Sequence, residues 1–578
     1  MIRLSNDIAY LSLEIGFEAD IPTYSGGLGV LAGDTLKAAA DVGLPYVGVT
    51  LLYRGGYFSQ KLGPDGGQTP EPHPWNPESV LRPMTPRIVV PIDGREVVIR
   101  AWRLDIHGVN GHIVPVYYLD SDLPENDDAA RRITDRLYDG GPDHRIRQEA
   151  ILGIGGRRML RAIGHDVKTL HMNEGHASFL CIELLSEYFA RVREQTGKSA
   201  HLDAAAVAHV RHKCVFTTHT PVEAGHDRFA IESVRAIVGD HPLFERPDLY
   251  GESSANGGGV LNTTRLAMNF SKFSNAVARK HGEISRKMFP GYPIRSITNG
   301  IHATSWASPR VRALFDTHMP LWRHDNHDLR LAHAIPDKDL WEAHKGEKAD
   351  MLRAVTERTG VELDPNALTV VFARRMTDYK RPGLVFADPD RLRSIAKDVG
   401  PIQFIFAGKA HPHDGRGQEI IRNIHRAARD LEGEVPVAFY PDYDIEIARH
   451  LVAGADVWLN NPRPPLEASG TSGMKAALNG VPSLSTLDGW WLEGWVEGVT
   501  GWAIGTEQEA PEKGPLLDEY DLSHAEAIYE KLGKAILPLY RRDRPEWIRV
   551  MKNAIALNGS YFTTQRMVSE YALRAYTA

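Results

Sequence analysis

The chain contains little cysteine, no long apolar run and no marked excess of charge of either sign. Its 578 residues include only 2 cysteines, Cys181 and Cys214, which excludes a disulfide framework and predicts a reducing, cytoplasmic location. No stretch approaches the ~18 uninterrupted apolar residues of a membrane-spanning helix, and residues 1–7 lack the apolar core of a signal peptide. The formal net charge is −7, so we expect neither nucleic acid nor a membrane surface as a partner.

A chain of 578 residues is too long for one hydrophobic core, and its pattern predicts at least two α/β domains. Short apolar runs typical of buried strands alternate with longer helical patterns, as expected for parallel sheets covered by helices. A turn around residues 298–300 marks the predicted boundary. Two doubly wound, Rossmann-like domains that face each other would bring the carboxyl ends of their strands to one interdomain cleft. The predicted strands cover residues 8–13, 46–53, 214–218, 368–373, 402–407, 435–440, 455–459 and 482–485.

The most informative segment is residues 467–476, with the sequence EASGTSGMKA. It follows a predicted strand and leads into a short helix that Gly480 can cap. Small residues let the backbone approach a ligand, and the free N–H groups of a helix start favour an anion. One lysine, Lys475, beside such a cradle suits an aldehyde cofactor that also carries a phosphate, which is pyridoxal phosphate. The alternative is a Ser/Thr-capped loop with a surface lysine. A GxxxxGK[ST] phosphate loop is excluded because Ala476 stands where Ser or Thr is required.

Two further segments have residue types that bind phosphate. Residues 373–382 read ARRMTDYKRP and close a predicted strand with 4 cationic side chains, which suits a phosphate dianion. The alternative there is a solvated basic turn. The turn Gly26-Gly27-Leu28-Gly29 opens a predicted helix and is either an anion site or a tight connection between a strand and a helix.

The longer string EASGTSGMKAALNG closely resembles the cofactor-lysine motif of the α-glucan (glycogen/starch) phosphorylases. Residues 373–382 match the family signature of a basic pair followed by Tyr, Lys and Arg. Matching segments run from residues 9–14 to 484–489, and the chain is similar to the short bacterial and archaeal members. The resemblance implies two facing domains, residues 1–298 and 299–545, with a helical segment, 546–578, packed back on the first. It also implies a homodimer.

The resemblance implies a role for each residue that matches the family's motifs. Lys475 would form a Schiff base with pyridoxal 5′-phosphate, and Arg375 and Lys380 would hold the phosphate substrate. The main-chain carbonyl of His219 would stabilise positive charge at the anomeric carbon, and Glu467 would accept hydrogen bonds from sugar hydroxyls. The other implied contacts are Thr471, Ser472 and Tyr443 to the cofactor, and Gly26, Gly27, Asn299, Tyr379, Ser469, Gly470, Glu174 and His176 to the substrates.

Residues 171–176, HMNEGH, superficially resemble a metal site. Two histidines five positions apart do not share a helix face, and the HExxH pattern is absent. We therefore assign no metal and interpret these residues as contacts to an acceptor sugar or as core.

The implied activity is reversible phosphorolysis with retention of configuration. A terminal α-1,4-glucosyl unit of a glucan or maltodextrin and inorganic phosphate would give α-glucose 1-phosphate, with the cofactor acting through its phosphate. Three features depart from the family pattern: no long amino-terminal regulatory extension, a shorter gating loop at residues 138–143, and Ser472-Gly473 in place of Gly-Asn. Three rivals remain: a nucleotide-sugar glycosyltransferase, which Ser25 in place of lysine disfavours, a pyridoxal-phosphate enzyme of amine chemistry, and a catalytically silent glucan-binding protein.

Overall fold

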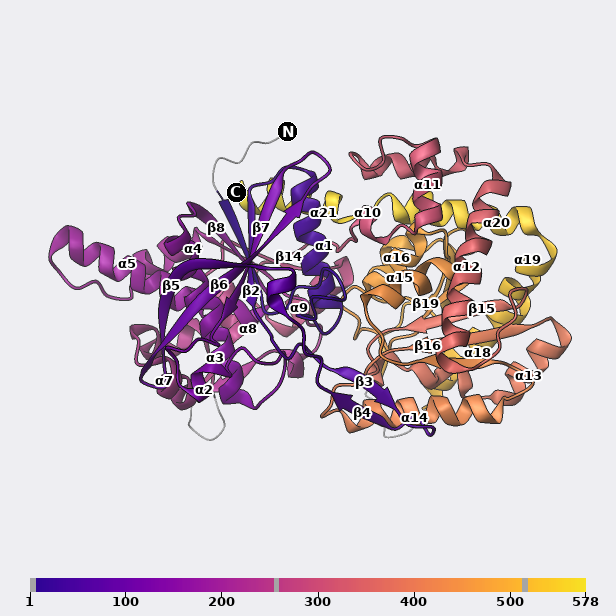
Figure 1. Ribbon diagram of the computed structural model, residues 1–578, viewed down its shortest axis with the longest axis horizontal. Coiled ribbons are helices and arrows are strands. Elements are labelled where there is room, and N and C mark those ends of the chain that lie inside the picture. The colour runs from indigo at the N-terminus through magenta and orange to yellow at the C-terminus, as the bar shows by residue number, and fades with distance from the viewer. Residues whose placement is uncertain (1–6, 254–258, 512–517, 578) are drawn as a thin grey trace.

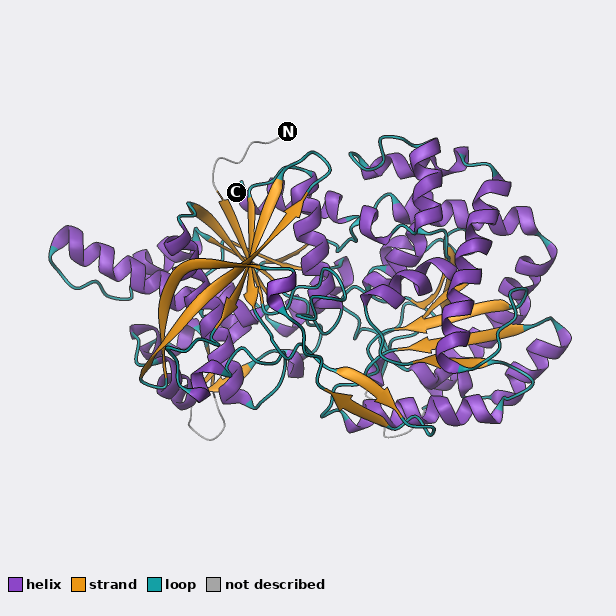
Figure 2. Ribbon diagram, in the orientation of Figure 1, coloured by secondary structure: helices purple, strands orange, loops and turns teal. Residues whose placement is uncertain are grey.

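Two large β-sheets with helices packed on them form the two halves of the chain (Figures 1 and 2). The computed structural model describes residues 7–253, 259–511 and 518–577. Residues 1–6, on which the signal-peptide prediction mainly depends, lie outside these ranges. No helix in the described ranges is long and apolar enough to cross a membrane. The predicted α/β class with parallel sheets is confirmed.

The sheet of the N-terminal half has the strand order β14-β13-β9-β8-β1-β2-β7-β6-β5. The pairs from β14 to β7 are parallel, whereas β6 and β5 add an antiparallel edge. The central strands are buried along almost their whole length, as apolar runs covered on both faces require. The strands are β1 (Asp7–Ser12), β2 (Tyr46–Leu51), β5 (Arg82–Ile92), β6 (Arg95–His107), β7 (Ile113–Asp120), β8 (Val167–Asn173), β9 (Cys214–Thr217), β13 (Phe273–Ala276) and β14 (Ile294–Ser296).

Helices and two small antiparallel sheets complete this half. A two-stranded hairpin consists of β3 (Ser59–Leu62) and β4 (Gln68–Glu71). A three-stranded sheet consists of β10 (Arg228–Ala230), β12 (Gly259–Asn262) and β11 (Gly251–Ser253). The helices are α1 (Gly27–Asp41), α2 (Asp128–Arg131), α3 (Pro142–Ala150), α4 (Gly156–Ile163), α5 (Leu180–Thr196), α6 (Ala204–Arg211), α7 (Ile231–Val238), α8 (Thr263–Asn269) and α9 (Arg279–Met288).

The sheet of the C-terminal half is parallel throughout, with the order β17-β16-β15-β18-β19-β20. Its strands are β15 (Leu368–Ala373), β16 (Ile402–Ala407), β17 (Val437–Tyr440), β18 (Val457–Asn460), β19 (Ser483–Thr486) and β20 (Gly501–Ile504). The helices are α10 (Ala303–Trp306), α11 (Pro309–His318), α12 (Asp337–Thr359), α13 (Pro389–Asp398), α14 (Gly415–Asp430), α15 (Ile445–Gly454), α16 (Thr471–Leu478), α17 (Trp491–Gly494), α18 (Glu519–Glu530), α19 (Leu537–Arg542), α20 (Arg544–Asn553) and α21 (Thr564–Tyr571).

The chain passes from the first half to the second near Ile301 and returns near Thr563, and these two crossings are bonded to each other. Ile301 N–H donates to the carbonyl of Phe562 (3.0 Å), and Thr564 N–H donates to the carbonyl of Ile301 (2.8 Å). Beyond the second crossing, α21 packs against α1. The last described residues therefore belong to a hydrophobic core of the N-terminal half.

The β3–β4 hairpin extends from the N-terminal half onto the C-terminal half (Figure 1). Gln60 N–H donates to Asp442 Oδ1 (2.7 Å), and Asp442 N–H donates to Gln60 Oε1 (2.8 Å). The side chain of Gln68 donates through Nε2 to the carbonyl of Ala410 (2.9 Å), and Ala410 N–H donates to Gln68 Oε1 (3.0 Å). The loops that follow β16 and β17 are thereby held against the N-terminal half.

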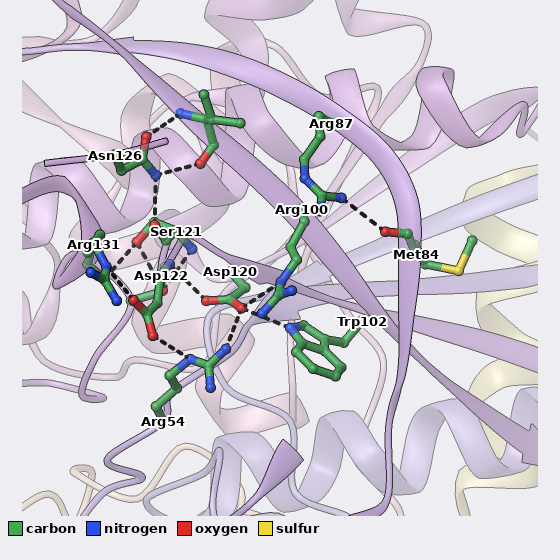
Figure 3. Close-up of polar contacts among 12 residues, drawn as sticks. Arg54, Met84, Arg87, Arg100, Trp102, Asp120, Ser121, Asp122, Asn126 and Arg131 are labelled. Atoms are coloured by element: carbon green, nitrogen blue, oxygen red, sulfur yellow. Dashed lines mark hydrogen bonds and ion pairs between the residues drawn. The ribbon is translucent and has the colours of Figure 1, made fainter. Parts of the chain in front are cut away.

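A buried carboxylate fixes the last residues of β7. Figure 3 shows Arg54, Arg100 and the indole of Trp102 converging on Asp120. The three donor nitrogens lie 2.9, 3.1 and 2.9 Å from Asp120 Oδ2, and the carboxylate is fully buried. Because Arg54 follows β2 and Asp120 ends β7, this cluster ties two adjacent strand ends together.

We expect Asp120→Asn to lower the free energy of unfolding by about 1–3 kcal/mol, because Arg100 loses its anion and Arg54 keeps only Asp122, while the indole keeps an acceptor. Urea unfolding measures this change. Asp166→Asn, which breaks an exposed ion pair with Lys168, is the control and should shift stability by less than about 0.5 kcal/mol. Equal losses in the two variants would contradict the role given to Asp120.

Candidate active site

The carboxyl ends of β8 and β9 bring predicted site residues of the N-terminal half together. Glu174 follows β8 in a left-handed conformation (φ 71°), and its Oε2 accepts hydrogen bonds from His219 N–H (2.6 Å) and Thr220 Oγ1 (3.1 Å). The ring of His219 is fixed by Asn173, whose Oδ1 lies 2.6 Å from Nε2. Burial lowers the pKa of His219 to about 3, so its imidazole is neutral. Glu174 thus anchors the loop that carries His219.

The Gly26-Gly27-Leu28-Gly29 turn, called the glycine loop below, opens a helix whose start no side chain caps. Helix α1 begins at Gly27, and Gly26 offers no capping group. Glu14 Oε2 accepts hydrogen bonds from Ser25 N–H (2.6 Å) and Gly26 N–H (3.4 Å), which sets the direction of the loop. A Cβ added at Gly26 or Gly27 would meet nothing within 4 Å, so there is open space beside this helix start. The geometry suits an anion approaching the backbone.

The basic segment after β15 divides into paired and unpaired cations. Arg374 is buried and donates to Glu467 Oε2 (2.6 Å) and Asn460 Oδ1 (2.9 Å). Among the described residues, the side chains of Arg375 and Lys380 have no hydrogen-bonded or ion-paired partner. Burial, with help from nearby Arg374, lowers the pKa of Lys380 to about 7. Two cationic groups without a carboxylate partner are therefore available to an anion.

Arg375 lies in the C-terminal half, but its charge acts on residues of the N-terminal half near the glycine loop. Burial raises the pKa of Glu14 and of Tyr57, both in the N-terminal half, and the charge of Arg375 opposes both rises. Direct contacts across the junction agree: Ile445 N–H donates to the hydroxyl of Tyr24 (3.1 Å). The two strand-end edges thus meet where Arg375, Glu14 and the glycine loop gather.

Lys475 lies inside the protein, on the first turns of α16. It is 8% exposed, and its ammonium nitrogen lies 3.8 Å from the centre of the Trp306 ring. No hydrogen bond or ion pair to this nitrogen occurs among the described residues. Burial lowers its pKa to about 8, which raises the share of neutral, nucleophilic amine. This environment excludes the alternative of a surface lysine.

The surroundings of Lys475 fit pyridoxal phosphate. Helix α16 starts after Gly470 (φ 85°) with no side-chain cap, so its first N–H groups are free for a phosphate. Ser469 Oγ is buried without a hydrogen-bond partner. Ser472 Oγ accepts from the indole of Trp458 (3.1 Å). A Cβ on Gly473 would come within 2.9 Å of Trp490, so only glycine fits that position.

Comparison with known proteins identifies the family. A model of the carbohydrate phosphorylase family matches residues 222–495. The chain is 38% identical to the maltodextrin phosphorylase of Thermococcus litoralis, over 99% of this chain and 70% of that protein. It is 38% identical to the glycogen phosphorylase of Mycobacterium tuberculosis, over 99% and 71% of the two chains, and 35% identical to that of Aquifex aeolicus, over 99% and 86%. The chain belongs to the carbohydrate phosphorylase family. The resemblance seen in the sequence is thereby confirmed.

In this phosphorylase-family chain, the remaining predicted residues lie as follows. Tyr379 precedes Lys380 in the chain, and the ammonium nitrogen of Lys380 lies 5.4 Å from the centre of the Tyr379 ring. Asn299 is buried, and its Oδ1 has no hydrogen-bond partner. His176 Nε2 lies 3.4 Å from Asp227, in a cluster with Glu149 whose ligand-type atoms all lie within 4.8 Å of one another. Tyr443, Thr471 and Gly470 are half-buried. Individual roles of these residues remain predictions.

Sequence reasoning missed two residues that hold the site together. Arg374 lies in the basic segment, where the sequence assigns it no role of its own, yet it forms the buried ion pair with Glu467. Glu14 ends the matching segment 9–14, one residue beyond the predicted strand, yet its carboxylate binds the glycine loop. Both lie inside segments that carry the resemblance, which is the one signal that pointed to them.

We expect the affinity for sulfate to fall about tenfold as pH rises from 6 to 9. The pKa of Lys380 is lowered to about 7, so its charge is present below that pH and is lost above it, while sulfate keeps its own charge. Lys380→Arg should abolish most of this fall because guanidinium does not titrate in this range. Calorimetric titration with sulfate measures both proteins, and an unchanged pH slope in the variant would refute the assignment.

Proposed function

We propose that this chain is an α-1,4-glucan phosphorylase. It catalyses the reversible, retaining phosphorolysis of terminal α-1,4-glucosyl units of glucan or maltodextrin by inorganic phosphate, and the product is α-glucose 1-phosphate. Relatives named maltodextrin and glycogen phosphorylase support the substrate class. The observation that carries the proposal is the pair of cations without a carboxylate partner among the described residues, Arg375 and Lys380, with the charge of Arg375 acting on Glu14, which anchors the uncapped start of α1. The buried Lys475 against Trp306 supports it independently.

The chain's own residues bind and orient the phosphate substrate. Arg375 and Lys380 neutralise a dianion, and the free N–H groups at the start of α1 donate to its oxygens. Each preorganised charged contact of this kind contributes about 2–4 kcal/mol at a transition state. The ion pair between Arg374 and Glu467 (2.6 Å) keeps that carboxylate ionised, so Glu467 can accept hydrogen bonds from sugar hydroxyls while Arg375 stays free for phosphate.

The bond is broken without a pair of protein carboxylates. Glycosidases place two such groups on either side of the scissile bond. Here the substrate phosphate gives its proton to the departing sugar oxygen and then attacks the same face, which retains configuration. The His219 carbonyl stabilises the positive charge that develops at the anomeric carbon, and the bonds from Glu174 and Asn173 hold His219 in place.

Lys475, Thr471, Ser472 and Tyr443 would hold pyridoxal 5′-phosphate, with Lys475 as the covalent link. When bound, this group supplies a phosphate that gives and takes a proton beside the substrate. Asn299, Tyr379, Ser469, Gly470 and His176 contact sugar in this proposal. A buried amine whose pKa is lowered to about 8 supports the covalent link, and the uncapped start of α16 supports the phosphate position.

The finer architecture is also part of the proposal. Residues 1–298 and 299–545 form two facing Rossmann-like domains of the GT-B type, with the active site in the cleft between them. Of the helical segment 546–578, the part beyond Thr563 returns to the first domain, whereas residues 547–562 pack with the second. The run of parallel strands in each sheet and the packing of α21 on α1 support this arrangement. The enzyme is a cytoplasmic homodimer in this proposal.

We expect Lys475→Ala to abolish both glucose 1-phosphate formation from maltooligosaccharides and the near-ultraviolet absorbance of bound pyridoxal. The reason is that Lys475 supplies the amine of the covalent link in this proposal. Lys531→Ala, at an exposed lysine paired with Glu497, is the control and should keep both signals. Unchanged turnover in Lys475→Ala would end the cofactor proposal.

The rival activities give different results in the same assays. A nucleotide-sugar glycosyltransferase shows no lysine-bound chromophore. An enzyme of amine chemistry loses activity after borohydride reduction, whereas phosphorolysis largely survives because the cofactor acts through its phosphate. A silent glucan-binding protein consumes no phosphate from maltodextrin.

A further inference from the structure

Tyr138 lies at the point where the glycine loop, the N-terminal sheet edge and the C-terminal half come together. Its hydroxyl donates to Glu14 Oε1 (2.8 Å). Its carbonyl accepts from His411 Nε2 of the C-terminal half (3.3 Å). The residue opens the short segment 138–143 and has a left-handed conformation, φ 58°, which is uncommon for a bulky side chain. An unfavourable backbone held by contacts on both sides indicates a constrained position.

Glu14 is the link between Tyr138 and the glycine loop. The carboxylate is buried, 2% exposed, and its two oxygens have different partners. Oε2 accepts from the N–H groups of Ser25 (2.6 Å) and Gly26 (3.4 Å), whereas Oε1 accepts from Tyr138 (2.8 Å) and lies 3.4 Å from Ser25 Oγ. Without the tyrosine hydroxyl, Oε1 would keep only the long contact to Ser25, so the carboxylate could rotate and the loop would lose its fixed direction.

Arg145 packs against the ring of Tyr138. The guanidinium carbon lies 4.5 Å from the ring centre, a favourable cation–π distance. Arg145 Nε in turn lies 3.8 Å from Asp227 Oδ2 and 4.0 Å from Glu149 Oε1. Glu149 is completely buried. Arg145 therefore lies against the core and restricts the position of the Tyr138 ring.

We propose that Tyr138 is a positioning residue for the phosphate-binding glycine loop: its hydroxyl holds Glu14 against the loop N–H groups, and its ring and carbonyl are clamped by Arg145 and His411. This inference rests on the proposed function, because the loop matters to catalysis only if it binds phosphate. The shortened segment 138–143 acts as a fixed brace in this proposal. The brace connects the loop of one half to a histidine of the other.

The test compares the wild type with Tyr138→Phe, which removes only the hydroxyl and keeps the ring on Arg145 and the carbonyl contact to His411. Losing a hydrogen bond to a carboxylate should raise KM for inorganic phosphate about tenfold, while KM for the glucan stays within about twofold. The control is Tyr117→Phe, which removes a hydroxyl bonded to His165 at 2.9 Å elsewhere in this half. It should leave both constants unchanged.

The pH profile gives a readout that a general loss of structure would not produce. Burial raises the pKa of Glu14, and the bonds from Ser25, Tyr138 and Gly26 oppose that rise. The other titratable groups that face Glu14 are Arg375, whose charge also lowers its pKa, and the phenols of Tyr53 and Tyr57, which stay neutral. Removing the Tyr138 hydroxyl raises the pKa of Glu14 further.

Ionised Glu14 is required to accept the loop N–H groups, so activity is lost as pH falls through its pKa. The acidic limb of kcat/KM for phosphate should therefore move to higher pH in Tyr138→Phe and stay in place in Tyr117→Phe. Ionisation of phosphate itself is common to all three proteins and cancels in the comparison.

Amide hydrogen exchange tests the inference without activity. Peptides covering residues 14–30 should exchange faster in Tyr138→Phe than in the wild type or Tyr117→Phe. A wild type that consumes no phosphate would refute the proposed function, and the exchange experiment would still decide the role of Tyr138. A Tyr138→Phe protein that matches the wild type in phosphate KM, acidic limb and loop exchange would overturn the inference.

Discussion

The site depends on positive charge that the fold leaves without a carboxylate partner. Burying an unpaired cation is costly, and the buried Arg374 avoids that cost by pairing with Glu467 from the segment after β18. Lys380 has no such partner among the described residues, and burial lowers its pKa to about 7, whereas the neighbouring Arg375 is exposed. An incoming anion removes this penalty, so part of the free energy of binding is stored in the fold before the ligand arrives.

Two parallel sheets make this arrangement possible. The carboxyl ends of β8 and β9 supply Glu174 and His219, and the end of β15 supplies the cations. Neither edge is complete alone, because the uncapped helix start belongs to one half and the unpaired charges to the other. The hydrogen bonds that Gln60 and Gln68 of the β3–β4 hairpin make to the C-terminal half hold the two edges together.

The sequence was sufficient for features that depend on neighbouring residues. The apolar runs of β15 and β16 were predicted with the observed bounds, residues 368–373 and 402–407, and the residues around Lys475 indicated a phosphate cradle. Contacts between segments far apart in the sequence could not be predicted. Trp306 covers Lys475, and Tyr138 binds Glu14, yet no periodicity or spacing links these pairs. The antiparallel strands β5 and β6 were also missed, because their half-exposed pattern lacks the continuous apolar run that marks the buried parallel strands.

The paired crossings at Ile301 and Thr563 limit how the two halves can move. Two chain segments bonded side by side act as one hinge, so a relative rotation must pivot there, with little freedom to slide or twist. In Figure 1 the β3–β4 hairpin lies at the opposite end of the junction, where such a swing is widest. Gln68 bonds both backbone groups of Ala410, and Gln60 bonds the backbone N–H and the carboxylate of Asp442, so opening the junction at this end requires these four hydrogen bonds to break together.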